Sequence, residues 1–215
     1  SPVIETGDDQ SQEDDLPQRE PLTPELVEDE AIRGDFMLRW ALVLLALLMA
    51  CTEITETPTL MHIKSGQFTL ENGIPRTGVM SSSAEESPWH NLNWLFDVLL
   101  AGTFAMGGAI GLSIFKAVLG GVLFGIIVHI NRDAVSSWWG TICAGLALLV
   151  CYPRFSAQPE FITFIGLALT LHFLHRWREN GERKPLQNLV ILFAIWSNLD
   201  PRMFLGLAVI LLMVY

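Results

Sequence analysis

The side chains best suited to chemistry lie in a polar stretch at residues 53–92. Glu53 and Glu56 are close enough in sequence to hold a divalent cation together with water, although solvated loop carboxylates are the interpretation we favour. His62 and His90 follow as general bases or ligands, or else as hydrogen-bonded histidines at an interface. We favour the hydrogen-bonded role, because their spacing does not place two metal ligands on one helix face. The sequence therefore predicts no metal site and no cofactor.

Three further charged residues lie inside or beside apolar stretches. Asp97 belongs to the stretch 93–106, and Lys116 belongs to the next one. An unpaired carboxylate is costly in an apolar medium, so we predict an Asp97–Lys116 pair, with Lys116 bound to a lipid phosphate as the alternative. Arg154 occupies a turn that its guanidinium either caps or uses to bind a phosphate.

The charges and cysteines exclude two classes of protein. The net charge of −10 lies in residues 1–30, which hold eleven acidic residues and one arginine, whereas the rest of the chain is neutral. Without a basic face to displace counterions, a nucleic acid is not a partner. The three cysteines lie in apolar runs and cannot all pair, which excludes a secreted disulfide scaffold.

The N-terminal region divides into two predicted segments. Residues 1–22 have high charge and few large apolar residues, which predicts a disordered cytoplasmic tail that is either solvated or an electrostatic docking segment. Thr23 and Pro24 are typical of a helix start, with Thr as the capping residue and Pro at the first helical position. We therefore expect a short amphipathic helix over residues 23–35, lying on the membrane or on a partner.

The remainder has the composition of a multi-pass membrane domain, over residues 36–215. Hydrophobic residues make up 51% of the whole sequence, and the mean hydropathy is positive. A transmembrane helix needs about 20 apolar residues, and six stretches are candidates, although the last two are short for a full crossing. They are Phe36–Cys51, Ile110–Ile130, Ser136–Tyr152, Phe161–Leu174, Leu189–Leu199 and a run from Met203 to Tyr215. We predict an all-α membrane protein with about six transmembrane helices, and the apolar last residue favours a fragment of a longer chain.

The stretch Asn93–Met106 is short for a crossing, and the positive-inside rule decides its placement. If it crosses, four Lys or Arg residues lie inside and seven outside; if it returns to the same side, these numbers reverse. We therefore predict an interfacial helix in the outer leaflet over residues 93–106, an outer loop over residues 53–92 and a cytoplasmic N-terminus. The seven residues then predicted inside are Arg33, Arg39, Arg132, Arg176, Arg178, Arg183 and Lys184.

Two glycine pairs have the spacing of helix-packing motifs. Gly107 and Gly111 form one pair, and Gly121 and Gly125 form the other. Glycines four residues apart let helix backbones approach closely within a membrane. We expect these glycines to pack against a helix of the same chain or of another subunit.

Three stretches together resemble a known family. The run HIKSGQFTLENGIPR begins at His62, PRFSAQP begins at Pro153, and WSNL begins at Trp196. With their spacing, they resemble bacterial multi-pass proteins of the C-type glycosyltransferase superfamily (GT-C). The resemblance covers about residues 37–215 and implies the N-terminal half of a GT-C fold in a bacterial inner membrane. The positions that fit in and after the first stretch are His62, Ile63, Gly66, Gly73, Ile74, Pro75, Pro88, Trp89, Asn91, Trp94 and Leu95.

The sequence departs from the family pattern mainly at ionisable positions. In such proteins an Asp of the first loop acts on a lipid-phosphate sugar donor, and Pro58 stands at the matching position here. A second Asp is replaced by Gly78, and a His-Glu pair by Leu92 and Asn93. Residues that shape the fold match, whereas the carboxylates do not.

These departures predict a non-catalytic structural or accessory subunit of a larger bacterial membrane complex. Its expected partners are the lipid bilayer, other membrane subunits and a lipid phosphate. The alternative is an active membrane glycosyltransferase that uses a polyprenyl-phosphate-linked sugar donor, with Glu56 in place of the missing Asp. A transporter or channel has less support, because the centres of the expected spans carry almost no ionisable residues.

Overall fold

A computed structural model describes residues 24–52, 57–75, 90–130 and 137–214. The predicted all-helical fold is confirmed, since these ranges contain helices and no strand. The predicted tail and the Glu53–Glu56 pair lie outside them. The elements are α1 (Pro24–Ala50), α2 (Thr57–Asn72), α3 (Trp94–Ile130), α4 (Ser137–Cys151), η2 (Tyr152–Arg154), α5 (Glu160–Asn180), α6 (Lys184–Leu199), η3 (Pro201–Met203) and α7 (Phe204–Val214).

Helix α1 is continuous through the boundary predicted at residue 35. Its 27 residues join the expected amphipathic helix and the first apolar stretch into one element. An ion pair between Arg39 and Asp35, at 2.6 Å, links consecutive turns across that boundary. No proline interrupts the helix after Pro24. The composition changes from charged in the first half to apolar in the second, but the helical backbone continues through the change.

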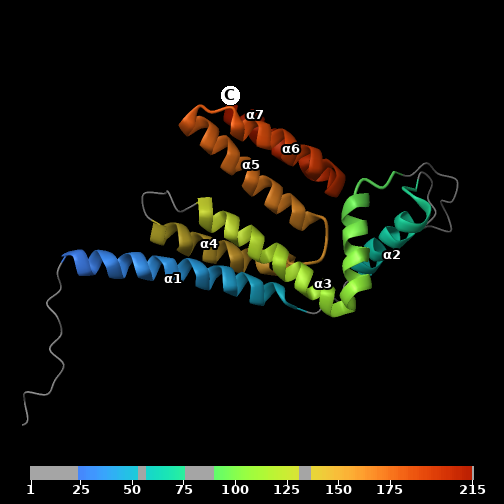
Figure 1. The fold of residues 1–215 in the computed structure, drawn as a ribbon, viewed down its shortest axis with the longest axis horizontal. Helices are drawn as coiled ribbons and strands as arrows, with labels where there is room; N and C mark the ends of the chain where they lie inside the picture. Colours follow the sequence, from blue (N-terminus) through green and yellow to red (C-terminus); the bar gives the residue numbers. More distant parts are fainter. Residues whose placement is uncertain (1–23, 53–56, 76–89, 131–136, 215) are drawn as a thin grey trace, which may run out of the picture.

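Helix α3 is kinked at Gly108. This residue has a φ of 56° and a ψ of −143°, which a side chain would oppose and glycine adopts readily. The kink divides α3 into a first arm over residues 94–107 and a second arm over residues 109–130, the two stretches that the sequence separates. In Figure 1 the first arm lies beside α2, while the second turns back toward α1 and α4.

The expectation of about six transmembrane helices is not supported. Among the described residues, one helix, Trp94–Ile130, is long and apolar enough to cross a membrane, and Trp138–Cys151 and Pro201–Met213 are apolar but shorter. The apolar part of α1 after Arg39 is only eleven residues long, from Trp40 to Ala50, against the roughly 20 that a crossing needs. The end of α5 carries histidines and arginines that lower its hydropathy.

The helices gather the polar turns at one end of the molecule. The end of α1, α2, the first arm of α3, η2 and η3 lie toward the right in Figure 1, while the start of α1 and the α5–α6 turn lie toward the left. A hydrogen bond from Trp94 Nε1 to Asn198 Oδ1, at 3.2 Å, ties the first arm of α3 to α6. The described parts of the predicted outer loop, residues 57–75 and 90–92, thus lie at the same end as the turns that follow α4 and α6.

Two apolar clusters hold this arrangement together. The larger one joins α1, the second arm of α3, α4 and α5, where Gly120 allows the backbone to approach α1 closely. The smaller one joins α2 and both arms of α3 to the polar turns. Its buried members are Ile63, Phe96, Leu100, Leu112, Ala157 and Leu199. The second cluster supports the site described next.

Candidate functional site

A buried carboxylate lies at the centre of the polar end of the molecule. Asp97, on the first turn of α3, is only 2% exposed. Its Oδ1 lies 2.6 Å from Nδ1 of His62 on α2, and its Oδ2 accepts a hydrogen bond from Asn91 Nδ2 at 2.7 Å. Both carboxylate oxygens therefore have partners within the chain.

The local sequence explains how these side chains meet. Asn91 Oδ1 accepts the backbone N–H of Asn93 at 3.0 Å, a turn that leads the chain into α3. The same asparagine donates from Nδ2 to Ser65 Oγ, at 3.0 Å. Gly66 faces the backbone of Asp97 with no room for a β-carbon, so only glycine allows α2 to lie this close to α3. The close crossing brings His62 within reach of the carboxylate.

The geometry gives the His62 imidazole a defined orientation. With a proton on Nδ1, it donates to Asp97 and leaves Nε2 as an acceptor. The ring also packs edge-on against Phe96, with centroids 5.9 Å apart and an interplanar angle of 87°. Its side chain is 22% exposed. An imidazole held in this way can brace two helices or accept a proton from a ligand.

Lys116 does not form the ion pair with Asp97 that the sequence predicts. Its Nζ donates to the backbone oxygen and to Oγ1 of Thr52, both at 2.8 Å, at the end of α1. Lys116 is 2% exposed. The predicted pair brought Asp97 and Lys116 together from neighbouring stretches of the sequence. The kink at Gly108 instead turns the second arm of α3, which carries Lys116, toward α1, while Asp97 on the first arm contacts α2.

A second buried carboxylate was not identified as a site residue from sequence. Asp200 is 1% exposed and accepts hydrogen bonds from Thr163 Oγ1, at 2.5 Å, and from the backbone N–H of Arg202, at 3.1 Å. Arg202 also pairs with Glu160 at 2.9 Å. The Asp-Pro pair after an apolar helix was the available signal, because aspartate commonly caps such a turn.

The other residues singled out from the sequence are dispersed. Gly121 packs against Leu47 of α1, and Gly111 faces the backbone of Thr103 across the kink. A β-carbon at Gly107 or Gly125 would meet no other atom within 4 Å. The side chain of Arg154 and the whole of Glu56 lie outside the described part of the structure.

The described ranges contain no cluster of metal-binding side chains. There, no three His, Cys, Asp or Glu side chains come together in a way that could hold a metal ion. The polar side chains at this end of the molecule instead bind one another across α2, α3, α5 and the turn after α6.

Comparison with known proteins gives no relative. No family model matches the chain, and no curated protein or solved structure matches it either. The resemblance to GT-C proteins therefore stays a prediction. Several positions that carry it nonetheless meet in space, since His62, Gly66 and Asn91 contact Asp97 and Trp94 bonds to Asn198.

Proposed function

We propose that the chain is a non-catalytic accessory subunit of a larger membrane complex in a bacterial inner membrane. The start of α1 faces the cytoplasm, and α2 with the first arm of α3 lies at the outer surface. The scaffold is a degenerate relative of GT-C proteins. In this role the chain supplies helix surfaces to other subunits and carries out no reaction.

The observation that carries this proposal is the internal use of the buried charges. Of the described ionisable residues, Asp97, Lys116 and Asp200 are buried, and each is bound by groups of the chain itself. A buried charge held by its own fold contributes to positioning helices and has little capacity left for a substrate. These residues therefore support a structural role.

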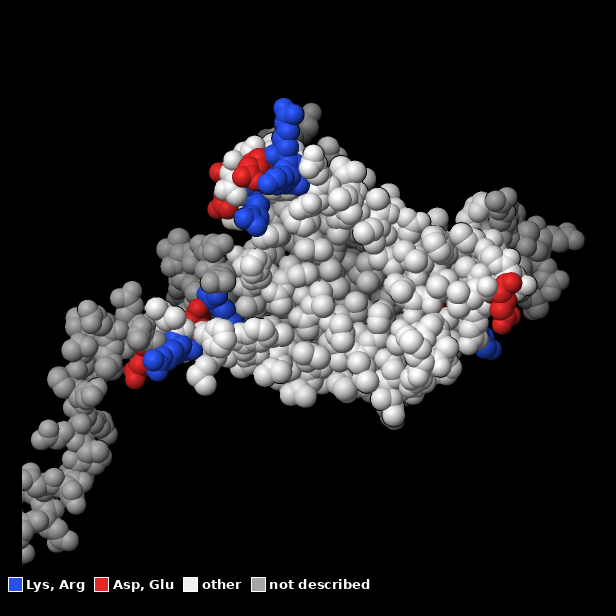
Figure 2. All heavy atoms as spheres, in the orientation of Figure 1, with Lys and Arg blue, Asp and Glu red and all other residues white. Residues whose placement is uncertain are grey.

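The distribution of charge supports membrane embedding. In Figure 2 the charged side chains on the visible face gather over the start of α1, the α5–α6 turn and α2, with a broad uncharged band between them. Large apolar side chains are also exposed on α1, α3 and α4, including Leu48 at 72%, Ile110 at 75% and Val150 at 77%. A soluble monomer rarely exposes so much contiguous apolar surface, whereas lipid or partner helices would cover it.

The open glycines give a test of the accessory role. A photo-crosslinking residue at position 107 or 125 has room in the monomer and should capture one defined membrane protein in stoichiometric yield. The matched control is the same residue at Lys64, which is exposed on the polar helix α2. Crosslinks that are equally diverse at all three positions would contradict a specific subunit interface.

A second function, sugar transfer from a polyprenyl-phosphate donor, is favoured by the Asp97–His62 pair. A carboxylate that orients an imidazole is an arrangement used by general bases. This function predicts that His62→Gln lowers transfer by about 100-fold or more at unchanged stability. It also predicts that Glu56→Ala abolishes turnover. The assay is transfer of radiolabelled sugar by the purified chain, and the accessory role predicts no transfer even before substitution.

A further inference from the structure

The turn between α5 and α6 carries the least compensated positive charge of the described chain. Four basic residues lie within nine positions, and none of them forms an ion pair within the described ranges: Arg176, Arg178, Arg183 and Lys184. Arg39 and Arg202, by contrast, pair with acidic residues. Glu179, the acidic residue of the turn on α5, lies 3.3 Å from His175.

The turn has a fixed shape. Gly181 ends α5 with a φ of 66°, and its N–H donates to Trp177 O at 2.8 Å, which closes the last helical turn. Helix α6 then begins at Lys184, and Pro185 is buried in its first turn. The basic side chains are therefore presented from two well-defined helix ends.

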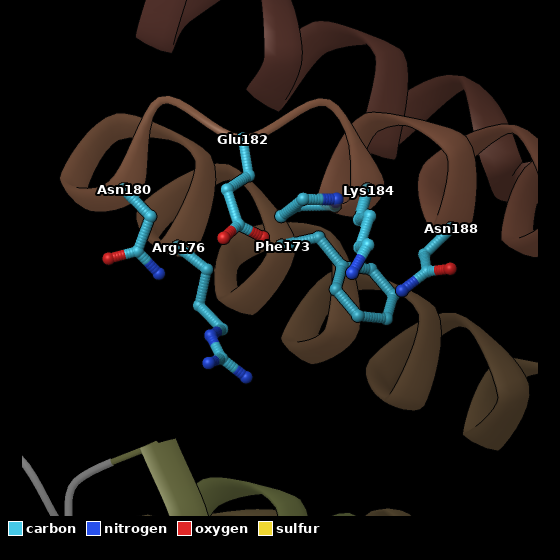
Figure 3. Close-up of a pocket in the computed structure, with 7 residues that line it drawn as sticks. Phe173, Arg176, Asn180, Glu182, Lys184 and Asn188 are labelled. Atoms are coloured by element: carbon cyan, nitrogen blue, oxygen red, sulfur yellow. The ribbon is translucent and has the colours of Figure 1, made fainter.

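These side chains border a pocket of about 250 Å³. Its lining combines two cations, Arg176 and Lys184, with the amides of Asn180 and Asn188 and the ring of Phe173. Figure 3 shows the labelled side chains extending to the same side of the turn. Glu182 also lines the pocket, and the two cations leave it with a net positive charge. Guanidinium, ammonium and amide groups together are suited to phosphate oxygens.

The surface of α6 continues from the pocket as an apolar stripe. Lys184 and Asn188 are followed on the same helix face by Ile191 and Ile195, which are 59% and 53% exposed. A polar site that opens onto an apolar stripe matches a phospholipid, whose headgroup is followed by acyl chains. A free phosphate would make no use of the stripe.

We propose that this pocket binds the phosphate headgroup of an anionic phospholipid, with the acyl chains along Ile191 and Ile195. The inference rests on the proposed membrane embedding and adds a lipid of stated charge as a ligand. Basic pockets between helices on the cytoplasmic side of membranes bind such headgroups. Arg176 and Lys184 supply the charge, and Asn188 supplies a further hydrogen bond.

The test is native mass spectrometry of the full chain in mild detergent, titrated with dioleoyl phosphatidylglycerol or dioleoyl phosphatidylcholine. We expect selective retention of phosphatidylglycerol. The double variant Arg176→Gln/Lys184→Gln should lower its affinity by about 25-fold, or about fivefold for each cation. Both residues are exposed, so the fold should survive. Lys64→Gln, an exposed lysine on α2, is the matched control and should bind as the wild type does.

Four outcomes would overturn the proposal. Equal retention of phosphatidylglycerol and phosphatidylcholine, or equal affinity of the double variant and the wild type for phosphatidylglycerol, would show that the pocket does not select an anionic headgroup. Displacement of the lipid by inorganic phosphate at equal concentration would identify a free-phosphate site. A large gain in lipid binding when Asp8, Asp9, Asp14 and Asp15 are changed to Asn would identify the acidic tail as the occupant. The titration needs no partner subunit, so failure of the accessory role would be seen separately, as the absence of a complex.

Discussion

Gly66→Ala is expected to lower the free energy of unfolding by about 3 kcal/mol or more, near the upper end of the cost of overpacking. The added β-carbon would overlap the backbone carbonyl of Asp97 and lie 2.8 Å from Cβ of Ala101. Backbone atoms cannot rotate away as the end of a side chain can. Helix α2 must therefore separate from α3, which also withdraws His62 from the Asp97 carboxylate.

The measurement for Gly66→Ala is unfolding in detergent by titration with a denaturing detergent, followed by tryptophan fluorescence. Gly102→Ala is the matched control. This glycine lies on the first arm of α3, as Asp97 and Ala101 do, and a β-carbon added there would meet no neighbouring atom within 4 Å. Alanine is a better helix former than glycine, so the control should be stabilised by up to about 1 kcal/mol. Equal effects of the two substitutions would show that α2 does not pack on α3 in this way.

Asp97→Ala is expected to destabilise the fold by about 3 kcal/mol, because it leaves buried donors without acceptors. Asn91 Nδ2 keeps Ser65 Oγ but loses the carboxylate as an acceptor, and His62 Nδ1 loses its partner, beside a position that is only 2% exposed. The same detergent titration measures the loss. A double-mutant cycle with His62→Ala isolates the pair, and we expect a coupling energy between about 0.5 and 3 kcal/mol.

Glu71→Ala is the control for the Asp97 substitution. Glu71 is an exposed acidic residue on α2, and its removal should change stability by less than about 0.5 kcal/mol. If Asp97→Ala were as mild as this control, the carboxylate would not hold the two helices together. The support that the buried charges give to a structural role would then be lost.

The sequence was most informative where patterns are local. The helical class follows from long apolar stretches with few breakers, and the two arms of α3 correspond to the separate apolar stretches predicted at residues 93–106 and 110–130. The continuity of α1 was missed, because a change from charged to apolar composition does not require a change in backbone conformation. The expected number of crossings is not supported, since several apolar stretches are short or end in charged residues.

The partners of the buried charges depend on tertiary structure and were not predictable. His62 and Asp97 are 35 positions apart, and Lys116 and Thr52 are 64 positions apart. Their meeting depends on the direction of the kink at Gly108 and on the close crossing at Gly66, neither of which has a periodic signature. The resemblance singled out His62, Gly66 and Asn91. They surround Asp97, for which the sequence predicted an ion pair with Lys116 instead.

The central proposal is that this chain is embedded in a membrane, acts within a complex and catalyses nothing. The most direct measurement is native purification from membranes in mild detergent, followed by mass determination of the intact particle. We predict a particle larger than the 24.0 kDa chain, with a second membrane protein in fixed stoichiometry and no sugar transfer. A chain that is recovered alone, or that transfers sugar from a polyprenyl-phosphate donor, would contradict the claim.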